Sequence, residues 1–364
     1  MMNRLPPVRI ARAAFSVRAA VQKAASRMVP ADVGLLELAS GFIATQAIYA
    51  ATRLGLPDAL AGGPRAPDDV AARLGLDADA THRLLRACTT WGVFREEPDG
   101  RFTLTPLAER LRSDVPGSMR DVVLMLGDPT YQRVWGELAE SVRTGTPGVE
   151  RAVGRTMWDH LDHDPEFDAV FNAAMARLSA QDWPAVDAVY DFSRFCRIVD
   201  VGGGHGGLLA LMLTAAPSAE GVLLDRAPMA DGARRLLGEA GVLDRCRIES
   251  GSYFDAVPDD GDLYVLRRVL HDYDDDRAAA VLSTVRRHMR ERATLLIVEG
   301  VVPPGNTPHF AKALDLDMLV FVGGRERTEE QWRTLLADTG FRTLRVIPTV
   351  SPVSLVEAVP GRLP

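Results

Sequence analysis

The stretch Val199-Asp200-Val201-Gly202-Gly203-Gly204-His205-Gly206-Gly207 decides the fold of this chain of 364 residues. An apolar run at residues 196–201 leads into it and predicts a buried strand, and the apolar run at 207–216 after it predicts a helix. Glycines allow a backbone to turn tightly and to approach a ligand closely. A strand, a glycine-rich loop and a helix in this order are typical of the ligand-binding edge of a parallel sheet.

Strands and helices alternate through the rest of this region, and they predict a doubly wound α/β sheet over residues 191–364. The further predicted strands are 221–224, 246–249, 263–266 and 293–298, the helices are 230–240, 275–290 and 328–339, and two β-like runs at 342–348 and 354–358 end the chain. Ligands of such sheets bind outside the carboxyl ends of the strands.

The region before the sheet is mainly helical. Two short helices, 67–74 and 78–91, are followed by two β-like runs on either side of Pro98-Asp99-Gly100, and Asp-Gly is a hairpin signal. These elements predict a winged-helix domain over residues 31–115, and a helical connecting region follows at 116–190. Residues 1–30 are predicted to be a basic extension.

A winged helix suggests DNA binding, because its second helix offers Arg83 and Arg86. Four acids surround that helix, namely Asp68, Asp69, Asp77 and Asp79. They would oppose the phosphate contacts that supply much of the affinity for DNA. We therefore favour a dimerisation module and expect no nucleic-acid partner.

Composition excludes several further classes of protein. The net charge is −7, but residues 1–30 hold six basic side chains and no acid, so the remaining chain carries −13. Such an acidic body argues against a protein that coats nucleic acid. The chain has no run of 18 apolar residues, so no membrane-spanning helix and no membrane partner are expected.

The cysteines and histidines narrow the chemistry. Cys88, Cys196 and Cys246 are scattered without a CxxC motif, which predicts a reducing, cytoplasmic location and no disulfide framework. His160 and His163 come nearest to a metal-ligand cluster, and we interpret them as a solvated helix end. No metal site is predicted.

The loops that follow the predicted strands carry the candidate ligand-binding residues. Gly202, Gly204 and Gly207 formally match GxGxxG, but Asp200 lies two residues before the first glycine, where an anion repels a pyrophosphate and suits a cationic ligand. Asp225 ends the next strand, where a carboxylate can accept two hydrogen bonds from a ribose diol. Residues 249–254 offer polar and aromatic surface for an adenine.

Three distant motifs give the chain a specific resemblance. DVGGG at 200–204 resembles a glycine-rich motif, LRRVLHDY at 266–273 is similar to LKxxLHDW, and GGRERT at 323–328 is similar to GGKERT. Together they resemble the S-adenosylmethionine-dependent O-methyltransferases of the plant caffeate and flavonoid type, which also occur in bacterial antibiotic pathways. The predicted winged helix resembles the dimerisation domain of that family, so the resemblance implies a homodimer.

The resemblance implies that the cofactor is S-adenosylmethionine. It assigns the cofactor contacts to Asp200, Gly202, Gly204, Asp225, Ser252, Tyr253, Arg267 and Ser179. Two of these positions depart from the family pattern, because Ser252 replaces an Asp and Arg267 replaces a Lys. Arginine keeps the charge of lysine but changes the geometry of its hydrogen bonds.

The resemblance also implies a reaction and its residues. His271 falls at the catalytic base, and Glu299 and Glu326 fall on the acids that flank it. A phenol has a pKa of roughly 10 and a histidine of about 6.5, so a histidine can accept the hydroxyl proton during methyl transfer. The substrate-pocket positions are Phe171, Met175, Met318 and Arg268, and the connecting region lines this pocket. Arg268, where plant enzymes often have an aromatic residue, suits an acidic or quinonoid acceptor.

Two other functions remain open at this point, and a winged-helix regulator is a third and weaker alternative. One is a family member that binds S-adenosylmethionine but has a hydroxylase-like or binding role without methyl transfer. The other is a NAD-dependent oxidoreductase, which rests on the formal GxGxxG match.

Overall fold

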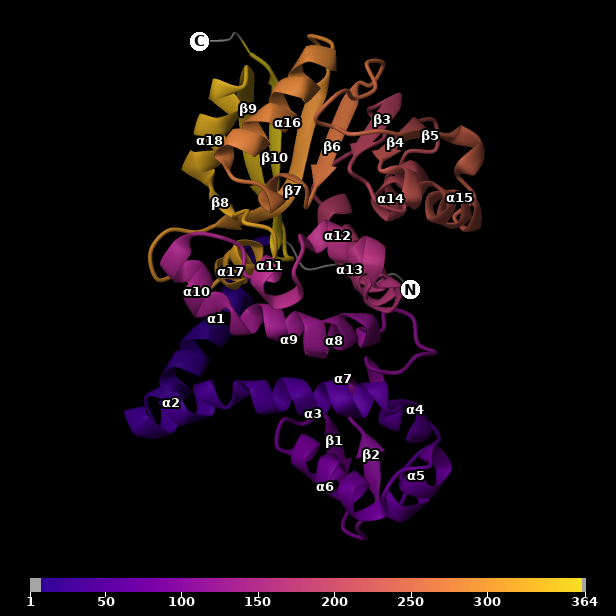
Figure 1. Ribbon diagram of the computed structural model, residues 1–364, viewed down its shortest axis with the longest axis vertical. Helices are drawn as coiled ribbons and strands as arrows, with labels where there is room; N and C mark the ends of the chain where they lie inside the picture. The colour runs from indigo at the N-terminus through magenta and orange to yellow at the C-terminus, as the bar shows by residue number, and fades with distance from the viewer. Residues whose placement is uncertain (1–7, 362–364) are drawn as a thin grey trace. The chain divides into compact units, whose positions relative to one another are not determined.

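The structure is a computed structural model that describes residues 8–361 (Figure 1). The chain divides into two compact units. The first unit, called the sheet unit, holds Glu137–Thr156, Ser179 onward and the chain up to Val17. The second, called the helical unit, holds Arg18–Gly136 and Met157–Leu178.

The sheet unit is built on a mixed sheet with strand order β5-β4-β3-β6-β7-β10-β9. Its strands are β3 (Arg197–Val201), β4 (Glu220–Asp225), β5 (Cys246–Ser250), β6 (Leu263–Arg267), β7 (Thr294–Val302), β9 (Phe341–Pro348) and β10 (Val353–Pro360). The strands from β5 to β7 pair in parallel, whereas β10 pairs antiparallel with both β7 and β9. This arrangement confirms the predicted Rossmann-like fold and shows that the two β-like runs at the end of the chain form an antiparallel pair at one edge.

Helices cover both faces of the sheet because the strands are apolar on both sides. On one face, Val199 and Leu266 pack with residues of α16 (Asp275–His288) and α18 (Glu329–Asp338). On the other face, residues of α14 (Gly207–Ala215) and α15 (Ala230–Glu239) pack against the strands. The loops at the carboxyl ends of the strands are therefore left as the place for a site. Figure 1 shows these layers.

The remaining elements of the sheet unit are short or were not among the predicted ones. They are α10 (Leu138–Thr144), α11 (Val149–Val153), η1 (Ala227–Met229), η2 (Leu243–Arg245), η3 (Leu270–Asp272), α17 (Ala311–Phe321) and β8 (Arg327–Thr328), which pairs with β7.

The helical unit contains the predicted winged helix. Helices α5 (Pro67–Leu74) and α6 (Ala78–Thr89) precede the antiparallel pair β1 (Phe94–Glu96) and β2 (Phe102–Leu104), and Asp77 caps α6 by accepting a hydrogen bond from the Ala80 N–H. The other helices of this unit are α2 (Ala31–Ala39), α3 (Gly41–Arg53), α4 (Leu56–Ala59), α7 (Pro106–Glu109), α8 (Arg120–Gly127), α9 (Pro129–Gly136) and α12 (Met157–His163). The predicted Asp-Gly hairpin is confirmed.

Two helices belong to both units. They are α1 (Val8–Ser26), within the predicted basic extension, and α13 (Pro165–Asp187). The predicted connecting region at 116–190 is divided between the two units, so the structure groups the chain along lines other than the predicted boundaries 1–30, 31–115, 116–190 and 191–364. Those boundaries remain a prediction.

An apolar face on α2 and α3 is exposed in the chain as described. Its most exposed side chains are Leu35, Leu36, Leu38 and Phe42, which are 67%, 67%, 82% and 64% exposed. The absence of a run of 18 apolar residues led us to expect no membrane-spanning helix. By length and composition, however, the stretch Ala31–Arg53 is long and apolar enough to cross a membrane. Its mean hydropathy is 1.3, and its most apolar part is 0% buried in the structure. The polar residues Ser40 and Gln46 interrupt the stretch but do not lower its mean hydropathy enough to change that result.

Candidate active site

The site is built around His271, which lies in the short turn η3 directly after β6 and is buried. Glu299, on the neighbouring parallel strand β7, holds this turn in place. Its Oε1 accepts hydrogen bonds from the backbone N–H groups of Val269, Leu270 and His271 at 3.1, 2.8 and 3.3 Å. Glu299 therefore fixes the backbone that carries the histidine, not its ring.

Glu326 orients the imidazole ring itself. Its Oε1 lies 2.7 Å from Nδ1 of His271, and both side chains are buried. A carboxylate oxygen accepts, so Nδ1 is the donor. On the other side of the ring, Oδ1 of Asp272 lies 3.5 Å from Nε2. The sequence did not single out Asp272, although it stands next to His271 in the LHDY motif.

Burial and neighbouring charges shift the pKa values of these side chains. Burial lowers the pKa of His271, but the charge and the hydrogen bond of Glu326 raise it more, and the resulting pKa is about 9. Burial raises the pKa of Asp272 to about 7 and also raises the pKa of Glu299 above its usual range. The surroundings of His271 thus favour its protonated ring.

The GGRERT loop closes over the turn that carries His271. A Cβ at Gly324 would lie 2.0 Å from the carbonyl oxygen of His271, and the Arg325 N–H donates to the same oxygen at 2.8 Å. Arg327 is fully buried and donates to the carbonyl oxygens of Leu270 and Tyr273 at 3.0 and 2.9 Å. The sequence singles out Glu326 in this motif but does not reveal the positioning role that these contacts give Arg327.

The glycine-rich loop forms a cradle next to this turn. Gly202 has a φ of +71°, and a Cβ there would lie 2.8 Å from a Val269 methyl and 3.3 Å from the Tyr253 ring. The Gly204 N–H donates to Oδ2 of Asp225 at 2.7 Å, and the Arg226 N–H donates to Oδ1 of Asp225 at 2.7 Å. The structure therefore brings four of the predicted cofactor contacts, Gly202, Gly204, Tyr253 and Asp225, to one edge of the sheet.

Asp200 is an acid that lies directly against the glycine-rich loop, because a Cβ at Gly203 would lie 2.5 Å from its Oδ2. It is buried, its Oδ2 has no hydrogen-bond partner, and burial followed by the charge of Asp225 raises its pKa to about 7. A cationic group bound nearby would restore the ionised form, because an opposite charge favours ionisation. This orphaned acid fits the sulfonium and ammonium charges of S-adenosylmethionine.

The residues predicted to flank the adenine are held by local contacts. The Ser252 hydroxyl accepts a hydrogen bond from the Phe254 N–H at 3.2 Å, and the hydroxyls of Tyr253 and Tyr273 lie 2.6 Å apart. Tyr253, Phe254 and Tyr273 also make ring contacts with one another. These aromatic rings give the loop after β5 a fixed shape.

Two arginines and one acid lie between the end of β6 and α13. Arg267 donates to the Ser179 hydroxyl at 2.6 Å and to Asp182 at 2.9 Å, and Arg268 donates to the same carboxylate oxygen at 3.3 Å. Asp182 is buried, and no sequence motif marks it. Ser179 and Asp182 share one face of the helix, since they are three residues apart.

The predicted substrate-pocket residues lie in different places. Phe171 and Met175 are on the part of α13 that belongs to the helical unit, whereas Met318 is buried on α17 of the sheet unit. Their roles in binding an acceptor remain predictions.

Among residues 8–361, one group has a spacing that would also suit a metal ion. Ligand atoms of His271, Glu299 and Glu326 all lie within 4.8 Å of one another. Oε1 of Glu299 already accepts three backbone N–H bonds, and Oε1 of Glu326 accepts from the ring, so we interpret the group as a proton-holding cluster. The other histidines considered, His160 and His163, lie on α12, where Nδ1 of His163 contacts the carbonyl oxygen of Asp159 at 2.7 Å.

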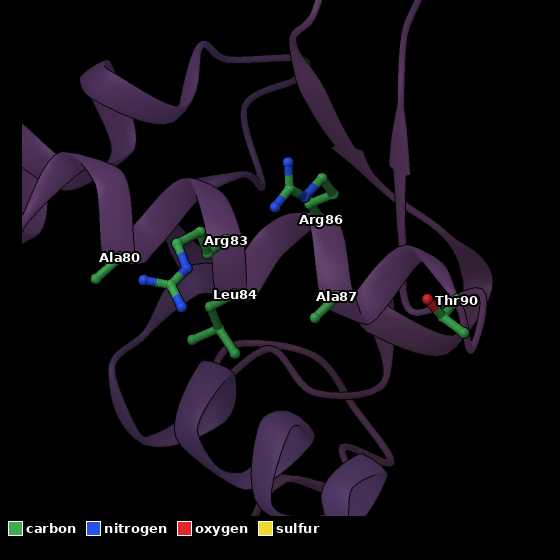
Figure 2. A pocket seen from close by; sticks show the side chains of 6 residues that line it. All are labelled: Ala80, Arg83, Leu84, Arg86, Ala87 and Thr90. Carbon is green, nitrogen blue, oxygen red and sulfur yellow. The ribbon is translucent and has the colours of Figure 1, made fainter. Parts of the chain in front are cut away.

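The outer face of α6 is a separate, open hollow in the helical unit (Figure 2). Ala80, Arg83, Leu84, Arg86, Ala87 and Thr90 line it. This is the face that a recognition helix would present to DNA, but Arg83 already pairs with Asp79 at 3.7 Å. We assign no function to this hollow.

A glycine cradle above a buried acid, next to a histidine and carboxylate pair at the carboxyl edge of a doubly wound sheet, defines the class of S-adenosylmethionine-dependent methyltransferases. Within that class the chain matches the O-methyltransferase domain over residues 135–342 and the O-methyltransferase dimerisation domain over residues 36–114. It belongs to the S-adenosylmethionine-dependent O-methyltransferase family, and its cofactor is S-adenosylmethionine.

Three known proteins show how close the relationship is. The chain is 43% identical to a phenazine O-methyltransferase of Lysobacter antibioticus over 332 residues, 91% of this chain and 97% of that protein. It is 39% identical to an 8-amino-8-demethylriboflavin N,N-dimethyltransferase of Streptomyces davaonensis over 315 residues, 85% of this chain and 90% of that protein. A solved O-methyltransferase from neocarzinostatin biosynthesis, in complex with S-adenosylmethionine and 2-hydroxy-5-methyl naphthoic acid, has a TM-score of 0.75 and 33% identity, and the match covers 87% of this chain and 95% of that one.

Proposed function

We propose that this enzyme methylates a phenolic hydroxyl of an aromatic small molecule in secondary-metabolite biosynthesis, with His271 as the general base. The observation that carries the proposal is the buried hydrogen bond between His271 and Glu326, because it directs Nε2 of the ring away from the carboxylate that orients it. A base of this kind is needed because few phenols are ionised at neutral pH.

Four residues of the chain would have distinct roles in this methyl transfer. Nε2 of His271 accepts the hydroxyl proton, and Glu326 stabilises the resulting imidazolium at Nδ1. Glu299 and Arg327 keep the backbone of the turn fixed while this happens. When bound, S-adenosylmethionine supplies a methyl carbon that the phenolic oxygen attacks as the carbon–sulfur bond breaks. Holding the reacting groups in line is the remaining contribution of the protein.

For the cofactor we propose the contacts that the sequence assigns. Asp200 would face the positive charges, Asp225 would accept from the ribose hydroxyls, and Tyr253 with Ser252 would flank the adenine. Gly202 and Gly204 would let the backbone approach, and Arg267 with Ser179 would complete the site on the side of α13. Each oxygen of Asp225 accepts one backbone bond and retains a second acceptor position for a ribose hydroxyl.

A nitrogen acceptor is the second candidate, because one relative is an N,N-dimethyltransferase. We favour oxygen because the basic pair of His271 and Glu326 is suited to removing a phenolic proton. The oxidoreductase alternative is not retained, since the family match assigns another cofactor. A family member without methyl transfer would not need a base bonded to a buried carboxylate.

We further propose that the enzyme is a cytoplasmic homodimer and that the exposed apolar face of α2 and α3 meets a second copy. The match to a dimerisation domain begins at residue 36, within α2, and supports this assignment. Leu38 is 82% exposed and Phe42 is 64% exposed, and large exposed apolar side chains that lie close together mark an interaction surface. Leu38→Glu should shift the protein to monomers in sedimentation analysis, whereas Leu107→Glu, which changes an exposed leucine on α7, should not.

The experiment that tests the proposed reaction is transfer of a labelled methyl group to a panel of phenols and matching anilines. We expect label on phenolic oxygen and weaker or no label on nitrogen. Label found only on nitrogen would replace the hydroxyl with an amine as the acceptor. A protein that binds S-adenosylhomocysteine but labels no member of the panel would contradict the proposal.

A further inference from the structure

Arg268 is held in an unusual backbone conformation at the edge of the site. Among residues 8–361 it is the one residue other than glycine with a positive φ, which is +52°. Side chains with a Cβ disfavour this region, and proteins retain such strain chiefly where a functional group must be aimed. Arg268 follows the last residue of β6 and lies three residues before His271.

The guanidinium of Arg268 is largely but not fully buried, and it is incompletely paired. Its side chain is 12% exposed, and its hydrogen bond to Asp182 is shared, because Arg267 donates to the same carboxylate oxygen. The Nε of Arg268 is buried and has no hydrogen-bond partner. A buried charged donor without an acceptor is costly, so this position is arranged to receive an anionic oxygen.

Arg268 comes shortly before the turn that carries the proposed base, His271. The charge of Arg268 acts on Asp272, whose carboxylate lies 3.5 Å from Nε2 of His271. Arg267, in contrast, bonds Ser179 and Asp182 on the side that we assign to the cofactor. Along the chain, Arg268 therefore joins Arg267, on the side assigned to the cofactor, to the turn that carries His271.

We propose that Arg268 is a specificity-determining residue that binds a carboxylate of the acceptor. The preferred acceptors are then aromatic hydroxy acids whose carboxylate lies close to the hydroxyl that is methylated. A guanidinium has five N–H donors in a planar fork, a geometry that suits a carboxylate better than the ammonium of lysine does. This inference rests on the proposed phenolic methyl transfer.

The test compares aromatic hydroxy acids with their own methyl esters, which differ only in the carboxylate charge. The wild-type enzyme should prefer the acid in kcat/KM by about tenfold or more, the expected effect of one charge-assisted hydrogen bond. Arg268→Gln should remove that preference, mainly through a higher KM for the acid. Arg268→Lys should restore part of the preference.

Two controls separate this role from others. Arg287→Gln removes the same charge from the exposed side of α16 and should change neither substrate. Binding of S-adenosylhomocysteine, measured by calorimetry, should be the same in wild type and Arg268→Gln. If that binding weakens as much as use of the acid does, Arg268 serves the cofactor and the inference is wrong.

The remaining outcomes are also decisive. An equal or better kcat/KM for the ester in the wild-type enzyme overturns the inference, while methylation of neutral phenols would still uphold the proposed reaction. If no phenol is methylated, the proposed reaction fails, and the inference is then judged by calorimetric binding of acid and ester to the enzyme with S-adenosylhomocysteine. Tighter binding of the acid that depends on Arg268 supports it, and equal binding rejects it.

Discussion

The Oε1 atom of Glu326 lies 2.7 Å from Nδ1 of His271, and the two residues are 55 positions apart in the chain. Because Nδ1 donates to the carboxylate, a neutral ring must carry its lone pair at Nε2. Glu299, the other acid that the resemblance placed beside the histidine, instead binds the backbone of the same turn. The two glutamates therefore have different roles: Glu326 orients the ring of His271, and Glu299 holds the backbone of its turn.

Replacing His271 by alanine tests the base directly. We expect turnover to fall by about 10²- to 10⁴-fold, the usual contribution of a positioned general base. Affinity for S-adenosylhomocysteine should remain close to that of the wild type in calorimetry. His288→Ala, on α16, is the matched control and should keep its turnover. Undiminished turnover in His271→Ala would remove this residue from the mechanism.

The raised pKa of His271 predicts the pH dependence of the reaction. The free enzyme holds the ring proton below a pKa of about 9, and only the unprotonated ring can accept a proton from the acceptor. The value of kcat/KM should therefore rise with pH up to about 9 and level off above it. Steady-state rates with an acceptor whose own ionisation lies outside this range provide the measurement. A profile that is flat across the neutral and mildly alkaline range would contradict it.

Glu326→Gln should move this pH profile. The substitution removes the negative charge that raises the pKa of His271. The rise of kcat/KM with pH should therefore shift to lower pH by at least about one unit. The plateau rate should fall by about ten- to a hundredfold, because the imidazolium loses its stabilising charge. Glu330→Gln, an exposed glutamate in the first turn of α18, should leave both quantities unchanged. A lower plateau rate without a shift of the rising part of the profile would mean that Glu326 supports the structure but does not set the pKa of His271.

Arg327→Gln tests the clamp on the turn that carries the base. The buried carbonyl oxygens of Leu270 and Tyr273 would lose their donors, and we expect the free energy of unfolding to fall by about 2–4 kcal/mol. Turnover should fall more than affinity for S-adenosylhomocysteine, since the displaced group is the histidine. Urea unfolding gives the stability, and Arg333→Gln, an exposed partner of Glu329 on α18, should change it by no more than about 0.5 kcal/mol.

Gly324→Ala tests how closely the GGRERT loop covers His271. A Cβ would lie 2.0 Å from the His271 carbonyl oxygen, which is backbone and cannot rotate away, so the loop must shift. We expect a lower melting temperature and reduced turnover. Gly136→Ala, at the end of α9, meets nothing within 4 Å and should be tolerated. Wild-type turnover in Gly324→Ala would show that the loop tolerates displacement without affecting the base.

Much of the fold follows from local sequence patterns. The apolar strands, the glycine-rich loop and the Asp-Gly hairpin are determined by residues close together in the chain, and the predicted elements agree with β3, β4, α14 and the wing within one or two residues. The pairing of β10 between β7 and β9 could not be predicted from those patterns, because strand order depends on packing between distant segments. The exposure of the apolar face of α2 and α3 could not be predicted, because it depends on which other segments pack against these helices.

For the site, too, some features follow from the sequence and others only from the tertiary structure. The sequence by itself determined the family and the cofactor and predicted the site residues, because short motifs such as DVGGG and LRRVLHDY carry them. Only the tertiary structure decided which acid bonds the ring of His271, that Asp182 joins Arg267 to Arg268, and that Arg327 clamps the turn. The physical reason is that a hydrogen bond depends on distance and direction in space, and these partners are separated by 55 to 86 positions of sequence.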